Sequence, residues 1–209
     1  MGRKAGMNNS ATIFGSWMKA LEFLQVVNGT KLCMRTALSD EEIPRISALC
    51  QQYSLYIEFA QFKVKIMDSE QKFSHKGITI PKDQEGLTFS YIAQEEKIAA
   101  LAKLYEQRND SKNLGKILGY PRCCIQFFCE HEEEKAKSDF DFTSLCMKRG
   151  IKYWELNISK RDQDISLISH FPCSMDCKES LLHAQKNYLL FQSVYREYAE
   201  VWQEPLRQV

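Results

Sequence analysis

The sequence predicts an α+β fold dominated by helices, with a small antiparallel sheet and a long C-terminal helix. Apolar residues recur at helical spacing near the N-terminus and after residue 95, and a segment rich in β-branched and aromatic residues lies between. The 209 residues suffice for one large domain. We therefore expect a single domain over 1–209, with helices and the sheet in 1–94 and a helical part carrying the Cys/His motifs in 95–209.

The bulk composition is that of an ordinary soluble globular protein. Apolar residues make up 44% and charged residues 26%, and the net charge of +1 carries no specific nucleic-acid signal. No apolar run approaches the ~20 residues of a membrane helix, and the N-terminus lacks the apolar core of a signal peptide. These features predict a cytoplasmic protein without membrane contact. There, the eight cysteines are expected to be free, buried, metal-bound or redox-active.

Two helices are predicted before the sheet. Apolar spacing indicates the first over residues 11–27, ended by Asn28-Gly29. Ser39-Asp40-Glu41-Glu42 is typical of a capping box, so the second is expected to begin there and to run to about Gln52.

Three strands are predicted in the middle of the chain. The first, over about 54–67, is rich in β-branched and aromatic residues. Two shorter strands follow at 78–80 and 87–92. The turn-forming residues of 81–86 predict a hairpin loop between these two short strands.

The rest of the chain is predicted to be mainly helical. A short strand is expected at Ile165–Ser169, leading into His170, within the poorly patterned stretch 151–169. The apolar spacing predicts helices over residues 95–107, 112–118, 121–137, 139–149 and 175–202.

Two segments stand out for their chemistry: Leu118-Gly119-Tyr120-Pro121-Arg122-Cys123-Cys124 and His170-Phe171-Pro172-Cys173-Ser174-Met175-Asp176-Cys177. Each places a proline just before cysteine, and proline favours the first turn of a helix. The partial positive charge of a helix N-terminus favours thiolate, the form that binds metals and attacks electrophiles. We therefore expect two helix N-termini to meet and to form one Cys/His site.

Metal binding is the leading interpretation of this site. The candidate ligands are Cys123, Cys124, His170, Cys173 and Cys177, a soft set suited to zinc or to an iron–sulfur cluster. Adjacent residues on a helix point about 100° apart, so we expect difficulty in bringing both members of the adjacent cysteine pair to one metal.

Two other function classes stay open. In a metal-free thiol or redox enzyme, Cys123 or Cys124 would be the nucleophile, His170 the base, and Cys173 or Cys177 a resolving thiol. In a structural or partner-binding module, aromatic residues of the C-terminal helix would form an interface, for example of a homodimer. The partner is a small molecule or a protein that the sequence does not identify.

The residues around these candidates have weaker signals. Arg122 can hold an anion or cofactor at the same helix start. His183 is a weaker site candidate, and His75 and His131 are expected to be solvated. The remaining cysteines have apolar neighbours and are expected to be buried as small hydrophobic residues: Cys33, Cys50, Cys129 and Cys146.

The pair of motifs resembles an uncharacterised prokaryotic protein family, common in archaea. Its members carry an L-G-Y-P-x-C-C segment and a later H-x-P-C-x-x-x-C segment, and the resemblance covers roughly residues 110–185. It implies that the five Cys/His candidates belong to one set. It brings no activity, because the family has none to carry over.

Overall fold

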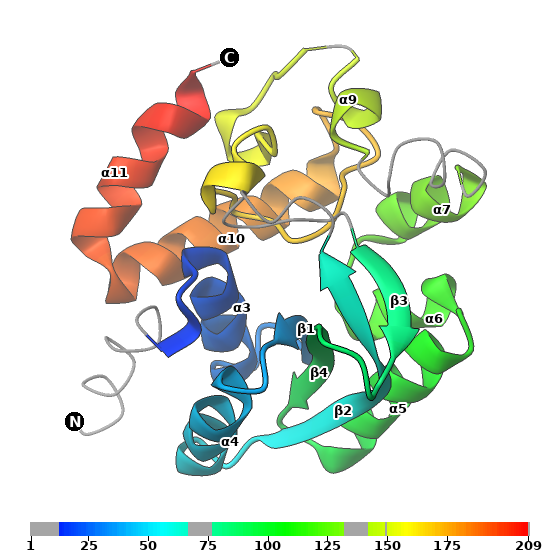
Figure 1. The fold of residues 1–209 in the computed structure, drawn as a ribbon. Coiled ribbons are helices and arrows are strands. Elements are labelled where there is room, and N and C mark those ends of the chain that lie inside the picture. Colours follow the sequence, from blue (N-terminus) through cyan, green and yellow to red (C-terminus); the bar gives the residue numbers. More distant parts are fainter. Residues whose placement is uncertain (1–12, 67–76, 132–141, 149, 209) are drawn as a thin grey trace.

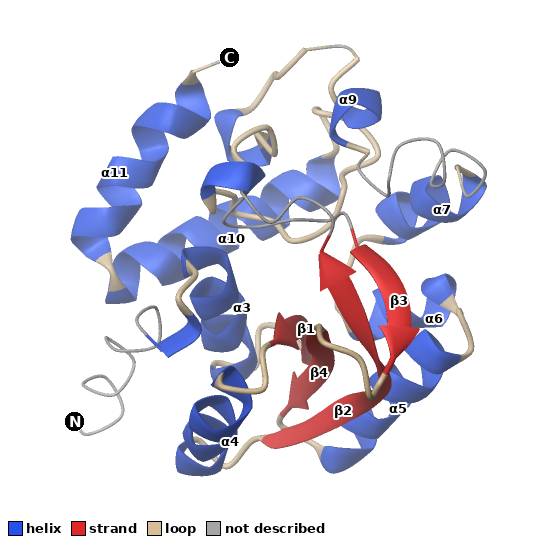
Figure 2. Ribbon diagram, in the orientation of Figure 1, coloured by secondary structure: helices blue, strands red, loops and turns tan. Residues whose placement is uncertain are grey.

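The structure is a computed structural model that describes residues 13–66, 77–131, 142–148 and 150–208. Helices surround one four-stranded antiparallel sheet, which confirms the predicted helix-dominated α+β class (Figures 1 and 2). The N-terminal elements are α3 (Trp17–Val27), β1 (Cys33–Leu38), α4 (Glu42–Gln52), β2 (Tyr56–Ile66), β3 (Gly77–Pro81), β4 (Leu87–Ala93) and α5 (Glu96–Gln107). The later ones are α6 (Ser111–Ile117), α7 (Arg122–Glu130), α9 (Thr143–Cys146), the short 3-10 helices η1 (Trp154–Leu156) and η2 (Arg161–Gln163), α10 (Lys178–Val194) and α11 (Arg196–Arg207).

The sheet order is β1-β4-β2-β3, so the predicted hairpin between the two short strands is wrong. The strands β3 and β4 pair with opposite edges of β2, and Lys63 faces Ile80 on one side and Thr88 on the other. The loop between them leaves β3 opposite Phe62 and enters β4 opposite Val64, so it crosses over β2 itself. Gly86 makes this crossing close, because an added Cβ would lie 2.9 Å from the Val64 carbonyl oxygen. A pairing with a strand that is not adjacent in sequence cannot be read from turn residues.

The sheet is covered on both faces, which explains why β1 was not predicted. Met34 and Leu38 of β1 pack with α3 and α4, whereas Cys33 packs on the opposite face with α5. A strand buried on both sides has no alternation of apolar and polar residues to reveal it.

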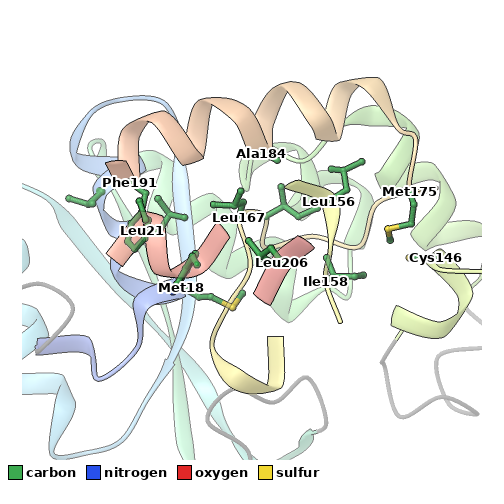
Figure 3. Close-up of a cluster of buried hydrophobic side chains, with 14 of the residues drawn as sticks. Met18, Leu21, Cys146, Leu156, Ile158, Leu167, Met175, Ala184, Phe191 and Leu206 are labelled. Atoms are coloured by element: carbon green, nitrogen blue, oxygen red, sulfur yellow. The ribbon is translucent and has the colours of Figure 1, made fainter. Parts of the chain in front are cut away.

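A second, helical core lies beside the sheet, and α3 contributes to both. Phe23 and Val26 of α3 face the sheet core, whereas Met18, Leu21 and Leu24 face the helical core. Figure 3 shows side chains from α3, α10 and α11 converging with the segment between η1 and α10. The organisation as one domain over 1–209 stays a prediction.

The start of α3 is fixed by a buried carboxylate from far along the chain. Asp164 accepts hydrogen bonds from the Ser16 hydroxyl at 2.6 Å and from the backbone N–H of Trp17 at 2.5 Å. It adopts a left-handed conformation, with φ of 64°. The helix predicted over 11–27 is thus interrupted at Gly15, which has φ of 61°, and α3 begins at Trp17. Residues 13 and 14 before the interruption are helical, and residues 11 and 12 lie outside the described ranges.

Several predicted elements agree with the structure. The helices over 95–107 and 112–118 correspond to α5 and α6. The predicted capping box is present, since the Ser39 hydroxyl accepts from the Glu42 N–H and Glu42 accepts from the Ser39 N–H. Asn28 caps the end of α3 as expected, and Gly29 has φ of 69°.

Other boundaries needed correction in the C-terminal part. The helix predicted over 121–137 is α7, which ends at Glu130, and residues 132–137 lie outside the described part. Of the helix predicted over 139–149, only α9 is seen, while 139–141 and 149 are not described. The helix predicted over 175–202 is two helices, α10 and α11, separated at Tyr195.

The segment Ile165–Ser169 is not a strand, contrary to expectation. Two of its carbonyls are taken by side chains, since Arg161 and Ser166 each donate to the Ile168 carbonyl at 2.9 Å and Asn187 donates to the Leu167 carbonyl at 2.8 Å. A backbone whose acceptors are occupied in this way does not pair with a neighbouring strand.

Within the described ranges, no helix combines the length and the apolar character needed to span a membrane.

Replacing Gly86 with alanine should destabilise the fold by about 1–3 kcal/mol, because the new methyl group overlaps the Val64 carbonyl and the Ile80 side chain. Urea unfolding followed by circular dichroism measures the change. The matched control is Glu85→Ala at the exposed neighbouring position, which should stay within about 0.5 kcal/mol of the parent. Equal stability of both variants would contradict the close crossing over β2.

Candidate metal centre

Four cysteines from two distant segments meet at one point. Cys123 and Cys124 lie in the first turn of α7, Cys173 lies in the loop before α10, and Cys177 caps the start of α10. All four sulfurs lie within 4.8 Å of one another. The Cys177 sulfur is 3.6 Å from that of Cys123 and 3.7 Å from that of Cys124. These four residues could hold a metal ion.

The first pair is positioned by a tight connection between α6 and α7. Gly119 has φ of 74° and ends α6, while the Tyr120 N–H reaches back to the Gly115 carbonyl at 2.9 Å. Pro121 is then the N-cap of α7, and the first helical residue is Arg122. Pro121 therefore lies one residue before the helix that was predicted to start with it. At Gly115 an added Cβ would lie 2.9 Å from Ile125, so the missing side chain lets the two helices approach closely.

The second pair is held by backbone hydrogen bonds to sulfur. Cys177 is the N-cap of α10, and its sulfur accepts from the Ser180 N–H at 3.5 Å. The Cys173 N–H donates to the Cys124 sulfur at 3.3 Å and thereby joins the two segments. The helix predicted over 175–202 would place Cys177 in its first turn. The helix instead begins at Lys178, because Cys177 itself serves as the cap.

The adjacent pair on α7 does not diverge as its helical positions suggested. The sulfurs of Cys123 and Cys124 are 3.9 Å apart, and both lie next to Cys177. The ~100° between neighbouring positions describes where the Cα–Cβ bonds point, and rotation about χ1 brings the two sulfurs back together.

The site lies at the surface and is open on one side. Cys124 and Cys177 are buried and Cys173 is partly buried, whereas Cys123 is exposed. A metal ion or a reagent would therefore reach the cluster past Cys123.

The pKa values of Cys124, Cys173 and Cys177 are shifted by contacts within the group. The hydrogen bond between the Cys124 thiol and Cys177 raises the pKa of Cys124, and burial adds to the rise. The same bond lowers the pKa of Cys177, helped by the Ser180 hydroxyl and N–H. Burial and the nearby Cys177 charge raise the pKa of Cys173 to about 12. One thiolate therefore forms easily, whereas further thiolates need a cation to balance them.

His170 lies behind the four sulfurs and is not one of the group. Its Nε2 is 2.8 Å from the Ser180 hydroxyl, which in turn is 3.2 Å from the Cys124 sulfur. Burial, with Arg161 and His183 adding to the effect, lowers the pKa of His170 well below its ordinary value. The imidazole is therefore neutral at pH 7. Its assignment as a ligand or a base stays a prediction.

Sequence reasoning missed Ser180 as part of the site. Ser180 is buried and connects His170 to Cys124. Its only signal in the sequence is its spacing, three residues after Cys177. This places Ser180 in the first turn of α10, whose N-cap is Cys177.

The other candidates lie apart from the four sulfurs. Arg122 is exposed at the start of α7, and its role toward a cofactor stays a prediction. Cys129 is partly buried on α7 and lies outside the group, whereas Cys33, Cys50 and Cys146 are buried in the cores. His131 Nδ1 is 2.7 Å from the Phe127 carbonyl, and His75 lies outside the described residues.

Comparison with known proteins covers the whole candidate site. Residues 92–205, more than half of the chain, match the family model described as "Protein of unknown function (DUF483)". The four cysteines, His170 and Ser180 all lie in the matched region. This match confirms the resemblance to an uncharacterised family. No curated protein and no solved structure matches the chain.

Limited alkylation of the reduced, metal-free protein at pH 7 should label Cys123 first, because its thiol is exposed. Cys33 and Cys50 should resist, since burial raises the pKa of each to about 12. Only about one such thiol in 10⁵ is ionised at pH 7. Peptide mass spectrometry after a short iodoacetamide pulse measures the order, with urea-unfolded protein as the control in which all eight cysteines react. Labelling of Cys33 as fast as Cys123 would contradict this arrangement.

Proposed function

The chain belongs to this family of proteins of unknown function, and we propose that it binds one zinc ion through Cys123, Cys124, Cys173 and Cys177. The observation that carries the proposal is the convergence of four sulfurs, from two segments about fifty residues apart, to within 4.8 Å of one another. Zinc prefers four ligands in a tetrahedron and binds thiolate readily.

The spacing of the sulfurs supports a single ion. A zinc–sulfur bond of about 2.3 Å makes the sulfurs of a tetrahedral site about 3.8 Å apart. The three pairs among Cys123, Cys124 and Cys177 are separated by 3.6, 3.7 and 3.9 Å. These sulfurs are thus already spaced as ligands of one ion.

The same spacing argues against an iron–sulfur cluster. In a cluster of two or four irons, the four cysteines are shared among two or four metal ions with bridging sulfides between them. The ligand sulfurs then stand farther apart than around one ion. All four sulfurs here lie within 4.8 Å, so a cluster would require the two segments to separate.

Hydrogen-bond donors around the sulfurs support the charge of such a centre. Four thiolates and one Zn²⁺ carry a net charge of −2. The Cys173 N–H and the Ser180 N–H point at two of the sulfurs, and the Ser180 hydroxyl lies 3.2 Å from the Cys124 sulfur. The positive ends of α7 and α10 add to this stabilisation.

A structural role follows from the number of ligands. Four protein ligands complete the coordination of zinc and leave no position for a substrate, as in structural zinc sites. The ion would then join the start of α7 to the loop before α10. In this proposal His170 supports the centre through Ser180 and does not bind the metal.

A metal-free thiol or redox enzyme is the second candidate function. The observation in its favour is that Cys123 is exposed and its sulfur lies 3.6 Å from that of Cys177, close enough for a nucleophile and a resolving thiol. Against it, the expected base His170 contacts Ser180 and no sulfur directly.

The cellular location and the oligomeric state of the protein also stay predictions. A cytoplasmic location suits the proposal, because the reducing cytoplasm keeps the four thiols available for metal. A homodimer is retained as a prediction, and size-exclusion chromatography with light scattering tests it.

Protein purified without oxygen and without affinity-tag metals should contain one zinc per chain, measured by mass spectrometry of the metal and of the native protein. Replacing Cys173 with alanine removes one of four thiolates and should lower zinc affinity about 100-fold or more. Cobalt(II) substitution should give the visible bands of a tetrahedral thiolate site.

The matched control is Cys129→Ala, which removes a partly buried cysteine of α7 outside the group and should leave zinc binding unchanged. Absence of any metal from the parent protein would overturn the zinc proposal and favour the thiol enzyme. Finding stoichiometric iron with sulfide would show that the site holds an iron–sulfur cluster and not a single zinc ion.

Replacing Ser180 with alanine should weaken zinc binding by about 10- to 100-fold, because the hydroxyl that lies 3.2 Å from the Cys124 sulfur is lost. Competition with a chromogenic chelator measures the affinity. Ser193→Ala, at an exposed position of the same helix, is the control. If both variants bind zinc like the parent, Ser180 does not support the centre.

A further inference from the structure

We propose that a polar pocket beside the cysteines binds an uncharged amide group, either of a small amide or at the end of a larger ligand. The pocket has a volume of about 40 Å³ and lies where α3 ends, next to the Gly119 turn and α10. Lys31, Tyr120, Ser169, His170, His183 and Asn187 are among its lining residues. A single water needs about 10–15 Å³, so the space admits a group larger than one water.

His170 presents an unused nitrogen to this pocket. The residue is only 6% exposed, and its Nε2 is occupied by Ser180 at 2.8 Å. No group among the described residues bonds to its Nδ1. This nitrogen is not sealed from solvent, so a ligand or a water in the pocket can supply its hydrogen-bond partner.

The proposed zinc centre decides which kind of partner Nδ1 accepts, and this step rests on the proposed function. A zinc-bound Cys124 is a thiolate and accepts the Ser180 hydroxyl proton in a hydrogen bond. Ser180 must then accept from His170, which places the imidazole proton on Nε2. Nδ1 keeps its lone pair and therefore needs a hydrogen-bond donor from the ligand.

Lys31 offers the complementary donor. The residue is 7% exposed, and its ammonium carries three N–H groups. One pairs with the Glu22 carboxylate and another donates to the Ser169 hydroxyl at 3.0 Å. A third remains for a ligand acceptor, beside the Tyr120 ring.

The charges around the pocket favour an uncharged ligand. The positive charge of Lys31 is already balanced by Glu22, and no other lysine, arginine or carboxylate lines the pocket. The C-terminal end of α3, which carries partial negative charge, lies beside it, since Gln25 and Thr30 line the pocket. An anion would lack a free positive partner, whereas an amide offers an N–H to His170 and a carbonyl to Lys31.

The test uses the full-length, zinc-loaded protein with acetamide as the probe and acetate as its anionic isostere. Long-range ¹H–¹⁵N NMR of the imidazoles reports both ring nitrogens of His170. We expect Nε2 to be protonated before any addition, and Nδ1 to shift saturably with acetamide at millimolar concentrations. Acetate should bind about tenfold more weakly.

A double variant, Glu22→Gln with Lys31→Met, removes the ion pair without leaving a buried unpaired charge. It should weaken acetamide binding about tenfold and leave the zinc content unchanged. Lys186→Met, which removes an exposed lysine of α10, is the matched control and should leave both unchanged.

The outcomes separate this proposal from the zinc proposal. One bound zinc without an acetamide response overturns the pocket assignment alone, and tighter binding of acetate overturns the argument from charge. A proton on Nδ1 in the zinc-loaded protein overturns the hydrogen-bond chain. Acetamide binding that depends on Lys31 in a protein without zinc supports the pocket while the zinc proposal fails.

Discussion

The convergence of four cysteine sulfurs is the constraint on which the rest of the site depends. Like charges about 4 Å apart repel by roughly 1 kcal/mol in water and several times more near a protein surface, so four thiolates cannot gather without a cation. The surroundings of the sulfurs are arranged accordingly. The Gly119 turn and the Cys177 cap place the sulfurs at the positive N-terminal ends of α7 and α10. The Cys173 N–H donates a hydrogen bond to the Cys124 sulfur. Ser180 and His170 extend this arrangement inward to the pocket.

Local signals in the sequence predicted local structure, and the remainder depended on contacts between distant residues. Helix α5 and the Ser39 cap were predictable because periodicity and capping residues act within a few positions. The membership of the four cysteines in one set followed from the paired motifs. The placement of β3 was not predictable, because its partner β2 also pairs with β4. The role of Ser180 was hidden for the same reason, since its partners come from two other segments.

The family match begins at Ile92 and includes only the end of β4, yet β4 lies inside the sheet. Its neighbours β1 and β2 come from the unmatched residues, and so does α3, which contributes to both cores. Asp164, within the match, fixes the start of α3. The matched region therefore depends on the N-terminal segment to bury its apolar surface.

A metal bound by these cysteines would also act on the unfolded chain. It would link Cys124 to Cys173 and close a loop whose described part, after the end of α7, has little regular structure besides α9, η1 and η2. By the relation used for covalent cross-links, closing a loop of about 50 residues removes roughly 4 kcal/mol of chain entropy from the unfolded state. The irregular stretch between the motifs would then owe its order as much to this tether as to its own contacts. A small ion would serve in a reducing compartment as a disulfide serves outside the cell.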